Sequence, residues 1–313
     1  MEPKRILIAA IHYPIASGRY IARAFRRMGH DVKTIGPFTG LNIWGTSLPE
    51  GNEWMPNIWI HRDAYPDFVS TGFLELCDGN FIDDPEWVPD LIVSADSGYV
   101  FEHYNQTIPH VVYGVDNHVR DYHRGEVAYD HLFLAHGNGY RIGEKNVTHL
   151  PCAYDPDWHT ITRQWEDREF QVGMMGVIYP QRNKLLIRLS EENKTLAGTG
   201  HIREAYRNMY NQIQVSICNS VNGDVAQRIF ETAAMGCLIL SDECHDFDVL
   251  GFQAWKHYIP YKTPQEAVQN VKEVLHDWEP EKVQAMRVRS MEWVKPHTWD
   301  SRCRELLRGM FNE

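Results

Sequence analysis

Residues 215–242, VSICNSVNGDVAQRIFETAAMGCLILSD, predict a strand, a helix and a second strand in close succession. The apolar runs at the two ends of this stretch are typical of short buried strands. Between them, Asp224 is placed to cap the helix with Gln227 as its reciprocal partner, and Gly236 is placed to end it. Since a crossover of this kind joins parallel strands, the stretch predicts an α/β fold with a parallel sheet.

The same helix carries polar side chains on one side. At 100° per residue, Asp224, Arg228 and Glu231 share a stripe, and the apolar positions turn away from it. Open α/β sheets bind ligands at the carboxyl ends of their strands, which is where this helix begins. Glu231 is therefore a candidate for binding a ribose diol, since a carboxylate accepts two hydroxyl hydrogen bonds. The alternative is a surface Arg228–Glu231 ion pair worth about 0.2–0.5 kcal/mol.

The chain begins with the same alternation of strand and helix. Residues 5–11 predict a buried strand, residues 12–18 a turn, residues 19–28 a helix closed by Gly29, and residues 31–35 the next strand. This is the first unit of a doubly wound sheet. Further apolar runs predict parallel strands at residues 91–94, 110–115, 131–135 and 147–150.

A stretch with two prolines at residues 151–158 leaves this first sheet, and a second strand–loop–helix start follows at residue 170. A chain of 313 residues is long enough for two domains. We expect an N-terminal domain at residues 1–152, a C-terminal domain at residues 153–295, and a terminal helix at residues 296–313.

Composition narrows the class of protein. The formal net charge of −11 argues against a generally basic nucleic-acid binder. Six scattered cysteines without a C-x-x-C motif, and an N-terminus unlike a signal peptide, predict reduced thiols in a cytoplasmic protein without a membrane span. The chain contains no H-E-x-x-H, G-x-S-x-G or Walker motif, so we expect no metal site and no hydrolase or P-loop chemistry.

Two basic residues occur where the second half begins. The loop after its first strand is GVIYPQRNK at residues 176–184, and we expect a helix to follow at residues 184–190. The free N–H groups of a helix N-terminus attract anions, and Arg182 and Lys184 add full charges there. The segment predicts a phosphate contact, with a solvated basic turn as the alternative.

Polar residues also follow the strands of the first half. Asp116 and His118 come after one strand, where either can act as a general base on an acceptor hydroxyl or simply form a capped turn. His12 and the Gly18 turn follow the first strand, so His12 is a candidate for contacting a phosphate or the acceptor, or a loop carbonyl. His136 occupies the corresponding place after a third strand.

These segments together resemble the GT-B glycosyltransferases, in particular the spore-maturation-type branch of the retaining, family-4-like group. The matching segments are VGMMG at residues 172–176 with Arg182, Asn219 with Ser220, QRIFETAAMG at residues 227–236, and HTWDSR at residues 297–302. The resemblance covers most of the C-terminal half and preserves the order of elements in the N-terminal half.

The resemblance implies two Rossmann-like doubly wound domains that face a cleft, with the C-terminal helix crossing back to the N-terminal domain. It implies that the C-terminal domain binds a nucleotide-sugar, with a UDP-sugar favoured. Glu231 would contact the ribose, and Arg182 and Arg228 the diphosphate, within a donor site that also includes Gly176 and Asn219. Because basic side chains and a helix end offset the charge of the leaving diphosphate, no metal or cofactor is expected.

One position departs from the family pattern. Related enzymes often carry a second Glu eight positions before the ribose-binding one, and here that position is Gly223, with Asp224 beside it. Asp224 either substitutes for this Glu in contacts to the sugar or only caps the helix.

We therefore expect a glycosyltransferase that moves a hexosyl or pentosyl group to a hydroxyl acceptor held by the N-terminal domain. Small molecules, proteins, glycans and a hydroxymethylated DNA base all remain possible acceptors. A DNA acceptor would need a basic face, for which Arg19, Arg23, Arg26 and Arg27 are candidates, although an ordinary solvated helix face is the alternative. A nucleotide-sugar 2-epimerase and a non-catalytic nucleotide-sugar-binding protein are the other functions compatible with the pattern.

Overall fold

The computed structural model describes most of the chain, in nine segments. These are residues 2–10, 15–35, 76–77, 80–81, 86–95, 107–119, 121–122, 129–201 and 203–311. They form two compact units, of which one holds the described residues up to Pro151 together with the chain from Trp299 onward. The other holds Cys152–Thr298. The candidate residue His12 lies outside the described residues.

The first unit is built on a six-stranded parallel sheet in the order β2-β1-β5-β6-β7-β8. Its strands are β1 (Arg5–Ala10), β2 (Asp31–Ile35), β5 (Leu91–Ala95), β6 (His110–Gly114), β7 (His131–Leu134) and β8 (Val147–His149). A separate antiparallel pair joins β3 (Leu76–Cys77) to β4 (Asn80–Phe81). The central strands β5 and β6 are buried along their whole length, which is why they appear in the sequence as continuous apolar runs.

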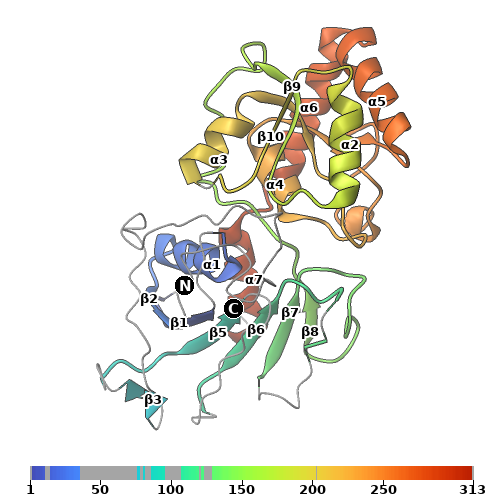
Figure 1. The fold of residues 1–313 in the computed structure, drawn as a ribbon. Helices are drawn as coiled ribbons and strands as arrows, with labels where there is room; N and C mark the ends of the chain where they lie inside the picture. Colours follow the sequence, from blue (N-terminus) through green and yellow to red (C-terminus); the bar gives the residue numbers. More distant parts are fainter. Residues whose placement is uncertain are drawn as a thin grey trace, which may run out of the picture. The chain divides into compact units, whose positions relative to one another are not determined.

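Two helices far apart in sequence, α1 (Ser17–Arg27) and α7 (Trp299–Phe311), pack against each other in this unit (Figure 1). The Tyr20 ring stacks on the fully buried Trp299 at 5.8 Å between centroids. The Trp299 ring also meets Tyr113 of β6 edge-on. The predicted terminal helix therefore belongs to the same compact unit as the N-terminal sheet.

The arginines of α1 do not form the free basic face considered for DNA. Arg19 is only 4% exposed, and Arg26 donates to the Val32 carbonyl at 3.1 Å. Arg27 forms an ion pair with Asp300 of α7 at 2.7 Å. Packing of α7 onto α1 has paired the charge of Arg27 with that of Asp300.

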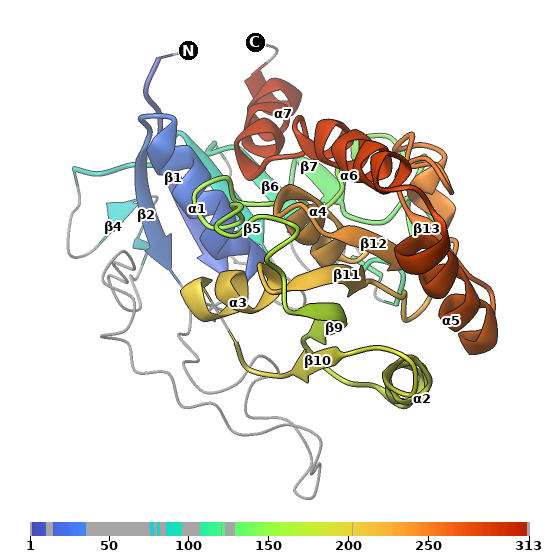
Figure 2. The same ribbon diagram turned by 90° about the horizontal axis from the view of Figure 1, so that it is seen from above.

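The second unit is built on a five-stranded parallel sheet in the order β10-β9-β11-β12-β13 (Figure 2). Its strands are β9 (Phe170–Met175), β10 (Thr195–Gly198), β11 (Ile213–Ile217), β12 (Leu238–Ser241) and β13 (Ile259–Pro260). Its helices are α2 (Pro180–Ser190), α3 (Arg203–Tyr210), α4 (Gln227–Ala234), α5 (Pro264–Lys272) and α6 (Pro280–Val294), with a π-helical turn at Glu273–Asp277. Helix α2 packs on α5 and helix α4 on α6, and Figure 1 shows α3 on one side of the strands with α2 and α5 on the other.

The prediction of two α/β units with parallel sheets is confirmed, but the starts of three helices differ from the prediction. Helix α1 begins at Ser17, so Gly18 is helical and not part of a turn. Helix α2 begins at Pro180, four residues earlier than predicted, because proline suits the first helical position. Helix α4 begins at Gln227, and no side chain caps it at Ala226. The predicted capping role of Asp224 for this helix is therefore wrong.

Among the described residues, no helix combines the length and the apolar character needed to cross a membrane.

Candidate functional site

The carboxyl ends of two adjacent strands in the second unit bring most of the predicted donor residues together. Strands β9 and β11 pair in parallel, so the residues that follow them emerge at the same edge of the sheet. Gly176 directly follows β9, and Asn219 is the second residue after β11. Arg228 lies in the first turn of α4, the helix after β11. This edge is the candidate site.

Gly176 and Arg228 are in direct contact. Gly176 has φ +131°, a conformation that side-chain-bearing residues rarely adopt. A Cβ atom at this position would lie 2.5 Å from Nη2 of Arg228. The glycine is therefore required twice, once for its backbone angle and once because the guanidinium occupies the space of a side chain.

The rest of the Arg228 guanidinium is buried without a hydrogen-bond partner. Its Nε and Nη1 atoms contact no acceptor among the described residues. Burial lowers the pKa of Arg228, but the ionised forms of Tyr210, Tyr206 and Cys218 and the carboxylate of Glu231 raise it, so that it ends above its ordinary value. Removing a charged donor from water costs free energy, and hydrogen bonds to an anion offset that cost. The buried guanidinium atoms of Arg228 therefore suit an anionic ligand.

Arg182 lies in the first turn of α2 and connects the two loops of the site. Its side chain is nearly fully buried, its Nη1 donates to the Val177 carbonyl at 3.0 Å, and its Nη2 donates to the Asn219 carbonyl at 3.1 Å. Its guanidinium also lies over the Tyr179 ring. Burial and the nearby charge of Arg228 lower the pKa of Arg182 to about 10. Arg182 therefore fixes the loop after β9 to the loop after β11 while it adds a second positive charge.

Two helices start at this edge without a side-chain cap. The residue before α2 is Tyr179 and the residue before α4 is Ala226, and neither caps its helix with a side-chain hydrogen bond. The free N–H groups of the two first turns thus add partial positive charge beside the arginines. Lys184 does not join them, because it lies about 200° around α2 from Arg182 and is exposed to solvent.

Glu231 lies three residues after Arg228 and is buried at 6% exposure. Its Oε2 accepts a hydrogen bond from the Tyr206 hydroxyl at 2.5 Å, and its Oε1 accepts one from Nε2 of Gln227 at 2.7 Å. Nε2 of His159 lies 3.4 Å from Oε1. The alternative of a surface Arg228–Glu231 pair is therefore wrong, since the carboxylate is buried and is held by other groups.

Burial and the neighbouring Glu231 charge raise the pKa of Tyr206, so its hydroxyl keeps its proton and donates. No sequence pattern pointed to Tyr206 or His159, because they reach Glu231 from distant segments of the chain.

Two carboxylates fix the loop around Gly223, between β11 and α4. Asp242 accepts from the backbone N–H of Ser220 at 2.7 Å and from its hydroxyl at 2.5 Å. Asp224 accepts from the backbone N–H groups of Val221 and Asn222 at 2.8 and 3.0 Å. Asp224 therefore closes the turn before α4.

In the first unit, two predicted histidines meet at the carboxyl ends of β6 and β7. The rings of His118 and His136 form an edge-to-face pair with centroids 4.5 Å apart. The fully buried Asn117 holds them, since it donates to the His136 carbonyl at 2.6 Å and accepts from the His136 N–H at 2.9 Å. A Cβ atom at Gly139 would collide with Asn117, so that glycine permits the clamp. Asn117 was not singled out from the sequence.

The two other predicted residues of this unit have different surroundings. Asp116 is partly buried, and its carbonyl accepts from the N–H of Val119, which closes the turn after β6. A Cβ atom at Gly18 would lie 2.7 Å from Cβ of Ala10, so this glycine lets the start of α1 approach the end of β1. Gly18 thus has a packing role in the fold.

Within the described ranges, no group of three or more His, Cys, Asp or Glu side chains is placed to hold a metal ion.

Comparison with known proteins agrees with the two-unit α/β fold of the chain. Residues 159–308 match the family model described as "Glycosyl transferase-like". No curated protein sequence matches the chain. Among solved structures, an α-glucosyltransferase in complex with UDP and a 13-mer DNA is 11% identical, with a TM-score of 0.66 over 99% of this chain and 100% of that one.

Two further solved structures are similar along the whole chain. HepE from Anabaena, in complex with UDP and glucose, is 9% identical, with a TM-score of 0.63 over 99% of this chain and 100% of that one. A glycosyltransferase from Rickettsia africae is also 9% identical, with a TM-score of 0.59 over the full length of both chains. At this level of identity the similarity establishes the fold, which is the GT-B fold of glycosyltransferases.

Proposed function

We propose that this chain, which has the GT-B glycosyltransferase fold, transfers a hexose from a UDP-sugar to a hydroxyl acceptor. The observation that carries the proposal is that Nε and Nη1 of Arg228 are buried at the carboxyl edge of a parallel sheet with no hydrogen-bond partner among the described residues. Solved structures with this fold contain UDP, and one of them also contains glucose. Cytoplasmic location is part of the proposal, supported by the buried thiols of Cys218, Cys237, Cys244 and Cys303, which form no disulfide within the described part of the chain.

In this proposal the diphosphate of the donor binds against Arg228. Its oxygens accept from the unpaired Nε and Nη1, while the uncapped starts of α2 and α4 and the charge of Arg182 add to the positive potential. As the bond between the sugar and the diphosphate breaks, negative charge grows on the leaving oxygen, and fixed donors stabilise it without reorganisation. These groups supply the stabilisation that a metal ion would otherwise give, so we propose transfer without a metal or another cofactor.

Glu231 is proposed to bind the ribose. A carboxylate has about four acceptor positions, and Tyr206 and Gln227 occupy two of them. Nε2 of His159 lies 3.4 Å from Oε1, so at least one position remains for a ribose hydroxyl. The bonds from Tyr206 and Gln227 fix the carboxylate plane, so that little side-chain entropy is lost when a hydroxyl binds.

The first unit is proposed to hold the acceptor. His118 combines a buried Nδ1 that has no partner among the described residues with a ring fixed against His136. It is the proposed group that orients or deprotonates the acceptor hydroxyl, with Asp116 as its neighbour in the same turn. The acceptor is proposed to be a hydroxyl of a glycan or a small molecule.

The ribose contact offers a sharp test. Isothermal titration calorimetry with UDP and with 2′-deoxy-UDP should show that the wild type prefers UDP and that Glu231→Gln loses this preference. Glu191→Gln, which changes an exposed Glu paired only with Arg188, is the matched control and should keep the preference. An unchanged preference in Glu231→Gln would remove Glu231 from the ribose site.

The reaction itself is tested by incubating UDP-glucose with the protein, with and without a panel of hydroxyl acceptors. Transfer predicts a glycosylated acceptor. Conversion of the donor alone to an epimer would identify a 2-epimerase, and binding of UDP without any turnover across the panel would identify a binding protein.

A further inference from the structure

A second hollow in the C-terminal unit lies away from the donor-binding edge. It has a volume of about 460 Å³ and is formed where the segment before β9 and the start of β11 meet the junction of α5 and α6. It is lined by Trp165, Glu166, Gln214, Leu275, Trp278, Pro280, Glu281, Val283 and Gln284. Small-molecule sites have volumes of roughly 300–1,000 Å³ and combine apolar walls with a few polar groups, as this hollow does.

The hollow is separate from the candidate donor site. Gln214 is near the amino end of β11, whereas Asn219 lies beyond its carboxyl end. Five residues of extended chain span about 16 Å. A ligand in the hollow therefore binds at the opposite edge of the same sheet.

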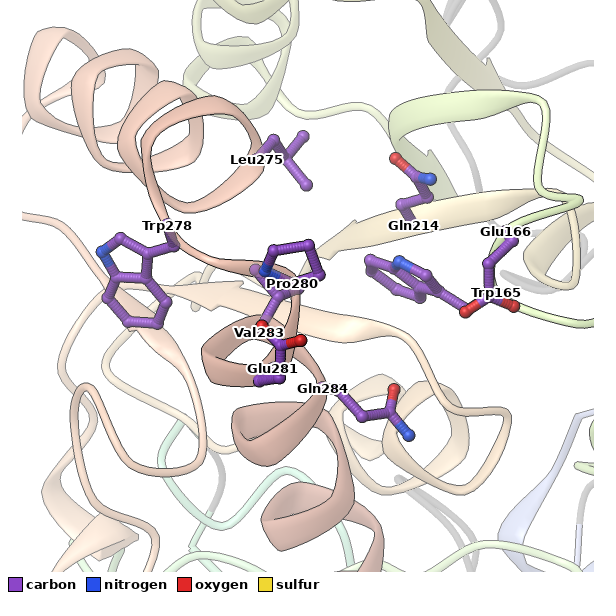
Figure 3. Close-up of a pocket in the computed structure, with 9 residues that line it drawn as sticks. All are labelled: Trp165, Glu166, Gln214, Leu275, Trp278, Pro280, Glu281, Val283 and Gln284. Atoms are coloured by element: carbon purple, nitrogen blue, oxygen red, sulfur yellow. The ribbon is translucent and has the colours of Figure 1, made fainter.

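Two tryptophans define the walls. Figure 3 shows the indoles of Trp165 and Trp278 at opposite sides of the hollow, with Pro280 and Val283 between them. Each indole already has a cation near its ring: Nζ of Lys282 is 3.4 Å from the Trp278 centroid, and Arg287 is 5.2 Å from that of Trp165. Flat apolar walls of this kind suit a ligand with apolar C–H faces.

Polar groups at the rim are available for hydrogen bonds. The side-chain amide of Gln214 and the carboxylates of Glu166 and Glu281 make no hydrogen bond within the described part of the chain. Gln284 uses only its oxygen, which accepts from Arg287 at 2.6 Å, so its NH₂ group remains able to donate.

The charges select the class of ligand. The carboxylates of Glu166 and Glu281 repel phosphates and nucleotides, and the resident Lys282 and Arg287 oppose a cationic ligand. A saccharide satisfies both constraints, because it is neutral and combines many hydroxyls with apolar ring faces.

The aromatic surface also extends beyond the hollow. The Trp255 ring lies 6.0 Å from that of Trp278 and is 41% exposed. Its backbone has φ +61°, which is uncommon for a residue that carries a side chain. An exposed tryptophan held in this conformation lengthens the surface in one direction, as a chain of several sugar rings requires.

We propose that this hollow, together with Trp255, is a second saccharide-binding site that holds a neutral oligosaccharide at a distance from the donor site. The proposal does not depend on the identity of the donor. If the chain is a glycosyltransferase, such a site holds a glycan acceptor or product by a second point of contact.

The test uses maltotetraose, cellotetraose and chitotetraose as probes, with binding followed by calorimetry and tryptophan fluorescence. Saturable binding of at least one of them is expected. The double variant Gln214→Ala/Gln284→Ala should weaken it by roughly tenfold or more, because it removes two hydrogen-bonding side chains from the site. Trp255→Ala changes an exposed side chain outside the core, and it should also weaken saccharide binding. Gln269→Ala, an exposed glutamine of α5 outside the hollow, is the matched control.

The same variants separate this site from the donor site. Affinity for UDP should be unchanged in the double variant, and tetrasaccharide binding should persist in Arg228→Met. Three outcomes would overturn the proposal: no saturable binding of any probe, binding that survives the double variant, or tight binding of tetralysine instead of the saccharides.

Discussion

Replacement of Arg228 by methionine tests the electrostatic core of the proposed donor site. The substitution keeps a flexible side chain and removes the Nε and Nη1 donors, which have no partner among the described residues. A hydrogen bond to a charged group is worth about 1.5–3 kcal/mol. Loss of two such bonds to the diphosphate should therefore raise the Kd for UDP by roughly 10²–10⁴-fold.

The same change should have little effect on folding. No hydrogen bond from the Arg228 side chain to another described residue is lost. At neutral pH the nearby Tyr206, Tyr210 and Cys218 are protonated, because burial raises the pKa of each. Glu231 is then the only anion among the groups that raise the Arg228 pKa. We expect the free energy of unfolding to change by about 1 kcal/mol or less.

The assay is calorimetric titration of UDP, with thermal unfolding followed by circular dichroism in the presence and absence of UDP. A ligand at 100 times its Kd stabilises the folded state by about 2.7 kcal/mol, so a fixed UDP concentration should raise the Tm of the wild type and not that of Arg228→Met. Arg188→Met, which removes an exposed arginine of α2, is the control and should bind UDP normally. A folded Arg228→Met protein whose Kd stays within about threefold of wild type would refute the assignment of Arg228 to the diphosphate.

Three further predictions concern a glycine, a histidine and an asparagine. Gly176→Ala should weaken UDP binding and lower the Tm, because its Cβ meets the arginine behind it, whereas Gly251→Ala, with positive φ but open space around it, should leave the Kd for UDP unchanged. Burial, followed by the charges of Lys256 and Arg289, lowers the pKa of His257 from 6.5 to about 4. The folded state therefore keeps its full stabilisation from neutral His257 above pH 6.5 and loses it as the pH falls towards 4. Urea unfolding between pH 7 and 4 should show this loss in the wild type and a flatter profile in His257→Asn, and equal slopes would contradict it. Asn117→Ala removes two buried hydrogen bonds and should lower the free energy of unfolding by about 2–3 kcal/mol, with slower transfer and an unchanged Kd for UDP. Val119→Ala, at a 60% exposed position of the same turn, should change neither measurement, and a similar loss in both variants would contradict the special role of the clamp.

Local patterns in the sequence determined the class of fold and the edge of the sheet where the candidate residues occur. The crossover at residues 215–242 folds into strand β11, helix α4 and strand β12, and the helix ends at Ala234, just before Gly236 with φ +70°. Short-range spacing suffices for this, because hydrophobic periodicity and glycine placement act within a few residues. Residues that follow parallel strands share an edge, so Gly176, Asn219 and Arg228 could be grouped before the structure was known.

The partners of these residues were decided by the tertiary structure alone. Spacing along the helix suggested that Arg228 pairs with Glu231, but Arg228 faces Gly176, and Glu231 is held by Tyr206 from helix α3. Lys184 was grouped with Arg182 by proximity in sequence, and the true start of α2 turns it to solvent. Most buried polar groups have a hydrogen-bond partner, and the chain supplies that partner from any element that packs nearby. Sequence therefore fixes which side chains reach the sheet edge, and packing between distant segments fixes what each of them contacts.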